Sequence, residues 1–135
     1  MKRIAIVGGG PVGLEAALRL RREGFEVALY EAGRVAEHVA RYGPVRLFTP
    51  FRMNSSELGR ASLGAGGASL PGLEDALTAT ELRERYLLPL ARLPELTGVV
   101  HEGARVTAIA REGCSKRQAE GRAGHSFLLR VERSL

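Results

Sequence analysis

The residues with the clearest chemical role are three glycines near the start of the chain and an acidic residue that follows them. Gly8, Gly10 and Gly13 have the G-x-G-x-x-G spacing, and Glu31 lies eighteen residues after Gly13. Glycines at this spacing allow a tight turn, the close approach of a pyrophosphate and close packing of a helix on a strand. A carboxylate placed like that of Glu31 accepts hydrogen bonds from a ribose diol. We therefore expect the chain to bind a dinucleotide.

The glycine turn itself is predicted to hold the phosphates. Backbone N–H groups and the positive end of the following helix dipole favour negative charge at this point. Pro11 suits the first helical turn, where its missing N–H removes no hydrogen bond. The alternative is a glycine-rich turn that binds nothing, which would leave the spacing and the position of Glu31 as coincidences. The candidate cofactor-binding residues of the turn are Gly8, Gly9, Gly10, Pro11, Val12 and Gly13.

A β-α-β unit is needed to position these residues. The apolar run Ile4–Val7 predicts a buried strand, Leu14–Glu23 has helical composition, and Phe25–Tyr30 predicts a second strand that ends at Glu31. A third strand is predicted at Val99–His101. The sheet order should be third strand, second, first, as in doubly wound folds.

Residues 32–79 are predicted to be an irregular insertion within the domain. Ser55 or Ser56 could cap a short helix there. The stretch from Gly59 to Gly72 is rich in glycine and reads as a flexible loop.

The C-terminal half is predicted to contain a helix and a β-ribbon. Thr80 should be the N-cap of a helix over Thr80–Leu88, and Pro89 should kink or break it. Ala104–Arg111 and Phe127–Val131 should pair as antiparallel strands joined by an exposed polar loop. The expected fold class is therefore α/β: a Rossmann-like FAD/NAD(P)-binding fold with a parallel sheet plus a β-ribbon, apparently truncated.

Composition limits the remaining classes of function. The chain has 135 residues, which is enough for one domain, and 44% hydrophobic with 26% charged residues describes a soluble globular protein. No apolar run approaches the length of a membrane span, so we expect no membrane partner. Cys114 is the lone cysteine and the three histidines lack zinc spacing, so we expect neither a disulfide framework nor a metal site. A cytoplasmic location is the default expectation.

The net charge of +5 does not favour nucleic-acid binding. Of the 20 basic residues 18 are arginine, and they are scattered over the whole chain. Aromatic residues make up 5% of the chain, too few to build base-stacking platforms.

The order of predicted elements, with the glycines and Glu31 in place, resembles the FAD-binding domain of flavoproteins that have two dinucleotide-binding domains. In that group a β-meander stands where a helix would otherwise cross back to the sheet. The segments Gly43–Pro50 and Asn54–Glu57 look like the region after the FAD fingerprint in flavin-containing monooxygenases and their bacterial relatives. Glu81–Leu87 resembles the helix that precedes the third sheet strand.

This resemblance implies FAD as the cofactor, NADPH as the co-substrate and a small-molecule substrate. In that family NADPH reduces the flavin, which then uses O₂ to oxygenate a soft nucleophile. Asn54 would be the catalytic residue, as a polar neighbour of the isoalloxazine; the alternative for Asn54 is a turn residue or helix cap. Ala32 and Arg34 would join Glu31 as cofactor-binding residues on the adenosine side, although Arg34 also fits as a solvated arginine.

The resemblance covers only the front part of such an enzyme. A Gly-Gly-Trp-type signature after Glu31 and a second G-x-G-x-x-G for NADPH are both absent from the sequence. The first strand would keep an open edge lined by Ile4 and Ile6. We therefore expect residues 1–135 to be an FAD-binding domain that is incomplete at its C-terminus, and at best a weak FAD binder without NADPH-driven turnover. A missing C-terminal half or a partner chain would complete it.

Two alternatives remain open at this point. The chain could be the NAD-binding domain of a dehydrogenase, or a truncated nucleotide-binding chain without catalysis. The ribbon favours FAD, because NAD domains usually continue with another βαβ unit. Glu31 argues against NADP at this site, since a carboxylate repels a 2′-phosphate.

Overall fold

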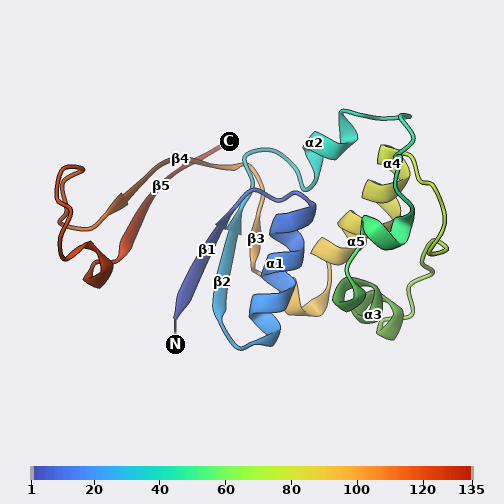
Figure 1. Cartoon of the computed structure of the whole chain (residues 1–135), viewed down its shortest axis with the longest axis horizontal. Coiled ribbons are helices and arrows are strands. Elements are labelled where there is room, and N and C mark those ends of the chain that lie inside the picture. Colours follow the sequence, from blue (N-terminus) through green and yellow to red (C-terminus); the bar gives the residue numbers. More distant parts are fainter. Residues whose placement is uncertain (1, 135) are drawn as a thin grey trace.

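Three parallel strands form the sheet that carries the glycine turn (Figure 1). The structure is a computed structural model, and it describes residues 2–134. Single turns of 3-10 helix lie at Phe51–Met53, Pro94–Leu96 and Arg122–Gly124. The strands and helices are β1 (Arg3–Val7), α1 (Pro11–Arg22), β2 (Glu26–Tyr30), α2 (Glu37–Ala40), α3 (Glu57–Ala65), α4 (Ala79–Leu82), a π-helical segment (Arg83–Leu87), α5 (Leu88–Ala91), β3 (Val100–His101), β4 (Ala104–Arg111) and β5 (Phe127–Arg133).

The sheet has the strand order β1-β2-β3, so the predicted order is confirmed. β1 pairs with β2 in parallel from Arg3 opposite Glu26 to Val7 opposite Tyr30. β3 adds to the other side of β2, where the N–H of Leu29 donates to the carbonyl of Val99 at 2.8 Å. Within residues 2–134 no strand pairs with the free side of β1, which is therefore an edge strand of the described part.

The hydrophobic core lies between the sheet and a layer of helices. Leu14 and Leu18 of α1 are fully buried, as is Leu29 of β2, because α1 packs on one face of the sheet. The helices α3, α4 and α5 lie on the far side of α1 (Figure 1). Alternation along β2 buries Val27 and Leu29 and leaves Ala28 half-buried on the opposite face of the sheet.

Two predicted boundaries near the front of the chain are corrected. The first helix begins at Pro11 rather than Leu14, because Gly10 is its N-cap and Pro11 takes the first helical position. The predicted loop from Gly59 to Gly72 is helical over its first residues, because α3 continues to Ala65 and has Ser56 as its N-cap. Position 59 is a glycine for packing: a Cβ there would overlap the hydroxyl of Tyr86.

The later helix also begins earlier than predicted. Thr78, and not Thr80, is the N-cap, and it forms a capping box with Glu81 in which each side chain accepts from the other's backbone N–H. The π-helical segment occupies the turns just before Pro89, which lacks the N–H that an α-helix would use there. The expected irregularity at Pro89 thus takes the form of a π-helical segment inside a continuous helix.

β4 and β5 form the predicted antiparallel ribbon, which extends away from the sheet (Figure 1). Pairing runs from Ala104 opposite Arg133 to Arg111 opposite Phe127, with a bulge between Val106 and Ala108. Among the described residues, no helix is both long enough and apolar enough to span a bilayer.

Candidate functional site

The glycine turn connects β1 to α1 and is shaped by two of its glycines. Gly8 has a φ of +107°, a conformation that side chains rarely adopt, and its N–H donates to the carbonyl of Tyr30 at 2.8 Å. A Cβ at Gly13 would overlap the carbonyl oxygen of Gly8, so glycine is needed for α1 to start this close to β1. A Cβ at Gly10 would instead meet no atom within 4 Å. The open space is thus on the side of Gly10, where a pyrophosphate could approach the backbone.

Glu31 fastens this turn to the end of β2. Its Oε2 accepts a hydrogen bond from the N–H of Gly9 at 2.7 Å, and its Oε1 accepts from the N–H of Gly33 at 2.7 Å. A Cβ at Gly9 would come within 3.0 Å of the Cβ of Glu31, so the middle residue of the turn is also constrained to be small. A carboxylate has about four acceptor positions, so Glu31 keeps capacity for ribose hydroxyl groups.

The loop after Glu31 carries the other two candidate adenosine-side residues. Ala32 is half-buried and Arg34 is exposed. The loop is fixed to its surroundings because the N–H of Val35 donates to Oε1 of Glu102 at 2.6 Å and the N–H of Ala36 donates to the carbonyl of Gly9 at 2.9 Å. Sequence reasoning did not identify Glu102, which follows β3 directly and marks the strand end that lies beside β2.

The candidate catalytic residue, Asn54, lines an open cleft of about 710 Å³ beside the end of the glycine turn. Asn54 lines this cleft together with Pro11 and Val12, although they are more than forty residues apart in sequence. The other predicted site residues do not line it, namely Gly8, Gly9, Gly10, Gly13, Glu31, Ala32 and Arg34. The remaining lining residues are Glu15, Ala16, Arg19, Met53, Ser55, Ser56, Leu58 and Leu82.

The side-chain amide of Asn54 is engaged with its own turn. Its Oδ1 accepts from the hydroxyl of Thr49 at 2.8 Å, and its Nδ2 donates to the carbonyls of Thr49 at 2.9 Å and Pro50 at 3.3 Å. These bonds fix the Asn54 segment against the cleft. Any contact of Asn54 with a ligand would have to add to them or replace them.

A second missed residue, Glu15, lies in the wall of the same cleft. Its carboxylate accepts hydrogen bonds from the hydroxyl groups of Tyr86 and Ser56. Burial, with the neighbouring Glu15 as the next cause, raises the pKa of the Tyr86 phenol well above its ordinary value, so Tyr86 remains a donor. The only sequence signal was a charged residue one turn into a helix that otherwise presents small and apolar side chains there.

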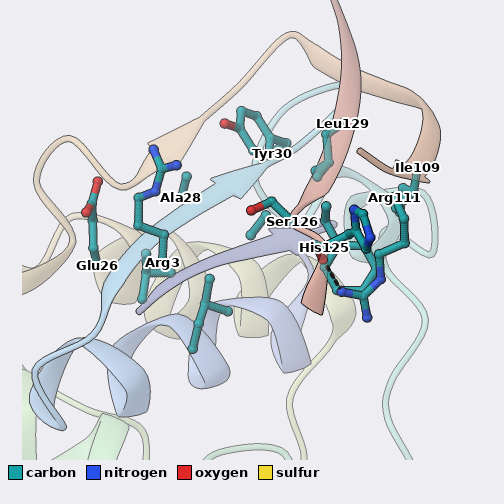
Figure 2. Close-up of a pocket in the computed structure, with 13 residues that line it drawn as sticks. Arg3, Glu26, Ala28, Tyr30, Ile109, Arg111, His125, Ser126 and Leu129 are labelled. Carbon is teal, nitrogen blue, oxygen red and sulfur yellow. Dashed lines mark hydrogen bonds between the residues drawn. The ribbon is translucent and has the colours of Figure 1, made fainter. Parts of the chain in front are cut away.

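A second and larger cleft, about 860 Å³, lies elsewhere (Figure 2). It opens between the face of the sheet opposite α1 and the ribbon, with Arg3, Ala28 and Tyr30 on one side and Arg111 and His125 on the other (Figure 2). None of the candidate cofactor-binding residues and not Asn54 lines it. Of the site residues predicted from the sequence, Pro11, Val12 and Asn54 line the smaller cleft, and none lines the larger one. Among residues 2–134, no group of three side chains is arranged to hold a metal ion.

Comparison with known proteins gives one family and several similar structures. The family model described as FAD dependent oxidoreductase matches residues 3–130. A bacillithiol disulfide reductase from Staphylococcus aureus is 17% identical with a TM-score of 0.65, over 99% of this chain and 35% of that one. An oxidised steroid monooxygenase bound to NADP is 20% identical with a TM-score of 0.68, over 97% and 23%. THI4 from Thermovibrio ammonificans is 20% identical with a TM-score of 0.58, over 96% and 46%.

These similarities concern the fold, because the identities are low. They confirm the predicted α/β class, a Rossmann-like fold with a parallel sheet and a ribbon. The chain spans between about a quarter and a half of the length of the three structures.

Proposed function

Because the chain belongs to the FAD-dependent oxidoreductase family, we propose that it forms the FAD-binding portion of a flavin enzyme. The observation that carries this proposal is the glycine turn: Gly8 and Gly13 close it tightly, and the space beside Gly10 is empty of protein atoms. A dinucleotide pyrophosphate fits such a turn at the start of a helix as long as α1. The family match favours FAD over the NAD alternative.

The turn, Glu31 and the cleft suggest how the parts of FAD would be held. Backbone groups of Gly9–Val12 would bind the pyrophosphate, and Glu31 would accept from the adenosine ribose hydroxyls. The flavin end would then extend toward the cleft that Pro11 and Val12 share with Asn54. When bound, FAD supplies the redox chemistry, while these residues bind and orient it.

The kind of oxidoreductase is a finer proposal. We favour a monooxygenase-like enzyme that uses NADPH and O₂, on the resemblance of the Asn54 segment and on the similarity to the steroid monooxygenase bound to NADP. The similarity to the disulfide reductase supports the competing proposal, an enzyme that reduces disulfides. Cys114 is the lone cysteine of the sequence and lies near the far end of the ribbon, after β4, so no pair of cysteines favours disulfide chemistry within this chain.

We further propose that a C-terminal portion or a partner chain completes the enzyme. The described residues leave β1 at a sheet edge, and the similar structures have chains more than twice as long. NADPH oxidation by this chain with added FAD tests the point. Saturable turnover would show that no further part is needed.

The test of FAD binding is a titration of the purified chain. Flavin fluorescence should report binding of FAD, and ADP should compete with it because both carry the adenosine and pyrophosphate groups. The test variant is Gly10→Val, in which the valine side chain fills the space that the phosphates need. Equal FAD affinity of the wild type and Gly10→Val would contradict the assignment of the site.

A further inference from the structure

A hydrogen-bonded cluster centred on Glu15 joins three elements around the smaller cleft. Oε1 of Glu15 accepts from the hydroxyl of Tyr86 at 2.5 Å and from the N–H of Ser56 at 3.3 Å. Oε2 of Glu15 accepts from the hydroxyl of Ser56, which itself accepts from the N–H of Gly59 at 2.7 Å. One carboxylate thus ties α1 to the N-terminus of α3 and to the π-helical segment.

The surroundings of the cluster are built to fit it. Tyr86 is fully buried, and its ring stands edge-on to Phe51 with centroids 5.2 Å apart. Gly59 faces the cluster, and a Cβ there would overlap the Tyr86 hydroxyl and lie 3.1 Å from both Glu15 and Ser56. The glycine therefore provides the space that the three side chains occupy.

Within residues 2–134 Glu15 forms no ion pair with a cation. The ion pairs in the described part of the chain involve other carboxylates, and Arg19, which lines the same cleft, pairs with Glu23 at 2.6 Å. The charge of Glu15 is met by hydroxyl and backbone donors from α3 and the π-helical segment. Such charge-assisted hydrogen bonds are shorter and stronger than neutral ones, so they fix geometry.

The position of the cluster relates it to the proposed FAD site. Glu15 lies two residues after Gly13, the last glycine of the turn, and Ser56 lies two residues after Asn54. Pro11 and Asn54 both line the cleft that Glu15 lines. We propose that Glu15 is a positioning residue, which sets the distance between the glycine turn and the Asn54 segment for a dinucleotide that contacts both. This inference rests on the proposed FAD site.

The role predicts different effects on ligands of different length. At the proposed site ADP would reach the glycine turn and Glu31, whereas FAD would extend further, to the Asn54 segment. In Glu15→Gln the amide cannot accept all three hydrogen bonds, and its NH₂ faces donors. FAD affinity should fall about tenfold, which is about the effect of losing one charged hydrogen bond. ADP affinity should change less than about twofold. Glu84→Gln, which removes an exposed carboxylate of the π-helical segment that does not line the cleft, should leave both affinities unchanged.

A double variant separates positioning from a general loss of structure. If Glu15 acts through the Asn54 segment, Glu15→Gln should have little further effect on FAD affinity in an Asn54→Ala background, because coupled residues are not additive. Tyr86→Phe removes one donor to Glu15 and keeps the ring on Phe51. It should show the same selective loss of FAD affinity if Glu15→Gln fails to fold.

The outcomes that overturn the inference are distinct from those that overturn the site. A wild type that binds neither FAD nor ADP contradicts the proposed function, and this inference with it. A wild type that binds both, with equal losses of FAD and ADP in the folded Glu15→Gln and Tyr86→Phe variants, contradicts the positioning role alone.

Discussion

The backbone N–H of Gly9 donates to Oε2 of Glu31 at 2.7 Å, and this contact joins the glycine turn to the end of β2 across 22 residues. The acidic residue that the sequence assigns to the ribose therefore also supports the turn that would hold the phosphates. Glu31 would act on both parts of the nucleotide site.

The first prediction separates these two roles of Glu31. In Glu31→Gln, the NH₂ group would face the N–H of Gly9 or Gly33, so a donor would lose its acceptor. The free energy of unfolding without ligand should fall by about 1–3 kcal/mol, measured by urea denaturation. ADP binding should weaken more than FMN binding, because FMN lacks the adenosine ribose. Glu37→Gln on α2 is the control, and equal losses for ADP and FMN would contradict a ribose contact.

The second prediction concerns the open side of the turn. Gly10 has φ −81° and ψ −174°, which valine adopts readily, and its Cβ would meet nothing within 4 Å. Gly10→Val should therefore keep its melting temperature within a few degrees of the wild type and lose FAD binding. A variant that melts much earlier would show that Gly10 is needed for folding rather than for the ligand.

The third prediction concerns Gly13, a glycine with no room for a side chain. Gly13→Ala places a Cβ against the carbonyl oxygen of Gly8, which is backbone and cannot rotate away. The variant should lose about 1–3 kcal/mol of stability or more, as over-packed sites do. Gly64→Ala within α3 has open space for its Cβ and should be stabilising by about 0.5–1 kcal/mol. Chemical denaturation of both variants checks the contrast, and similar stabilities would refute it.

The fourth prediction locates the start of the later helix. Thr78→Ala should cost about 1 kcal/mol of stability because it removes the N-cap, whereas Thr80→Ala should cost much less. The hydrogen bond from the backbone N–H of Thr78, and then the Thr78 side chain, hold the pKa of Glu81 below its usual range. The capping contribution of Glu81 is therefore present at neutral pH and should be lost as the pH falls through that lowered pKa. An NMR titration of the wild type should find the Glu81 pKa below its ordinary value, and an ordinary pKa would exclude the capping box.

How much could be predicted from the sequence depended on how far apart the interacting residues were. The turn from Gly8 to Gly13, Glu31 and the strand order follow from a local pattern with known geometry, and the structure has them where expected. The extent of α3 was missed because the role of Gly59 depends on Tyr86, 27 residues later.

The same limit applies to the candidate site. Glu15 could not be recognised, since its partners Ser56 and Tyr86 lie in segments that only the folded chain brings to α1. The capping error is different in kind. Thr78 and Thr80 are both good caps by residue type, and Glu81 three residues after Thr78 is the signal that distinguishes them.

The strand order also governs the sequence of events when the chain is made. β1, α1 and β2 are complete within the first 30 residues, so they can emerge from the ribosome and pair as a local unit. The backbone of Leu29 in β2, however, finds its partner at Val99, which is synthesised 70 residues later. Until then β2, the middle strand of the sheet, has a free edge. Residues 32–79 are synthesised while that edge is still unpaired. The slow, non-local step in this chain is therefore the arrival of β3 at an edge that has been exposed since early in translation.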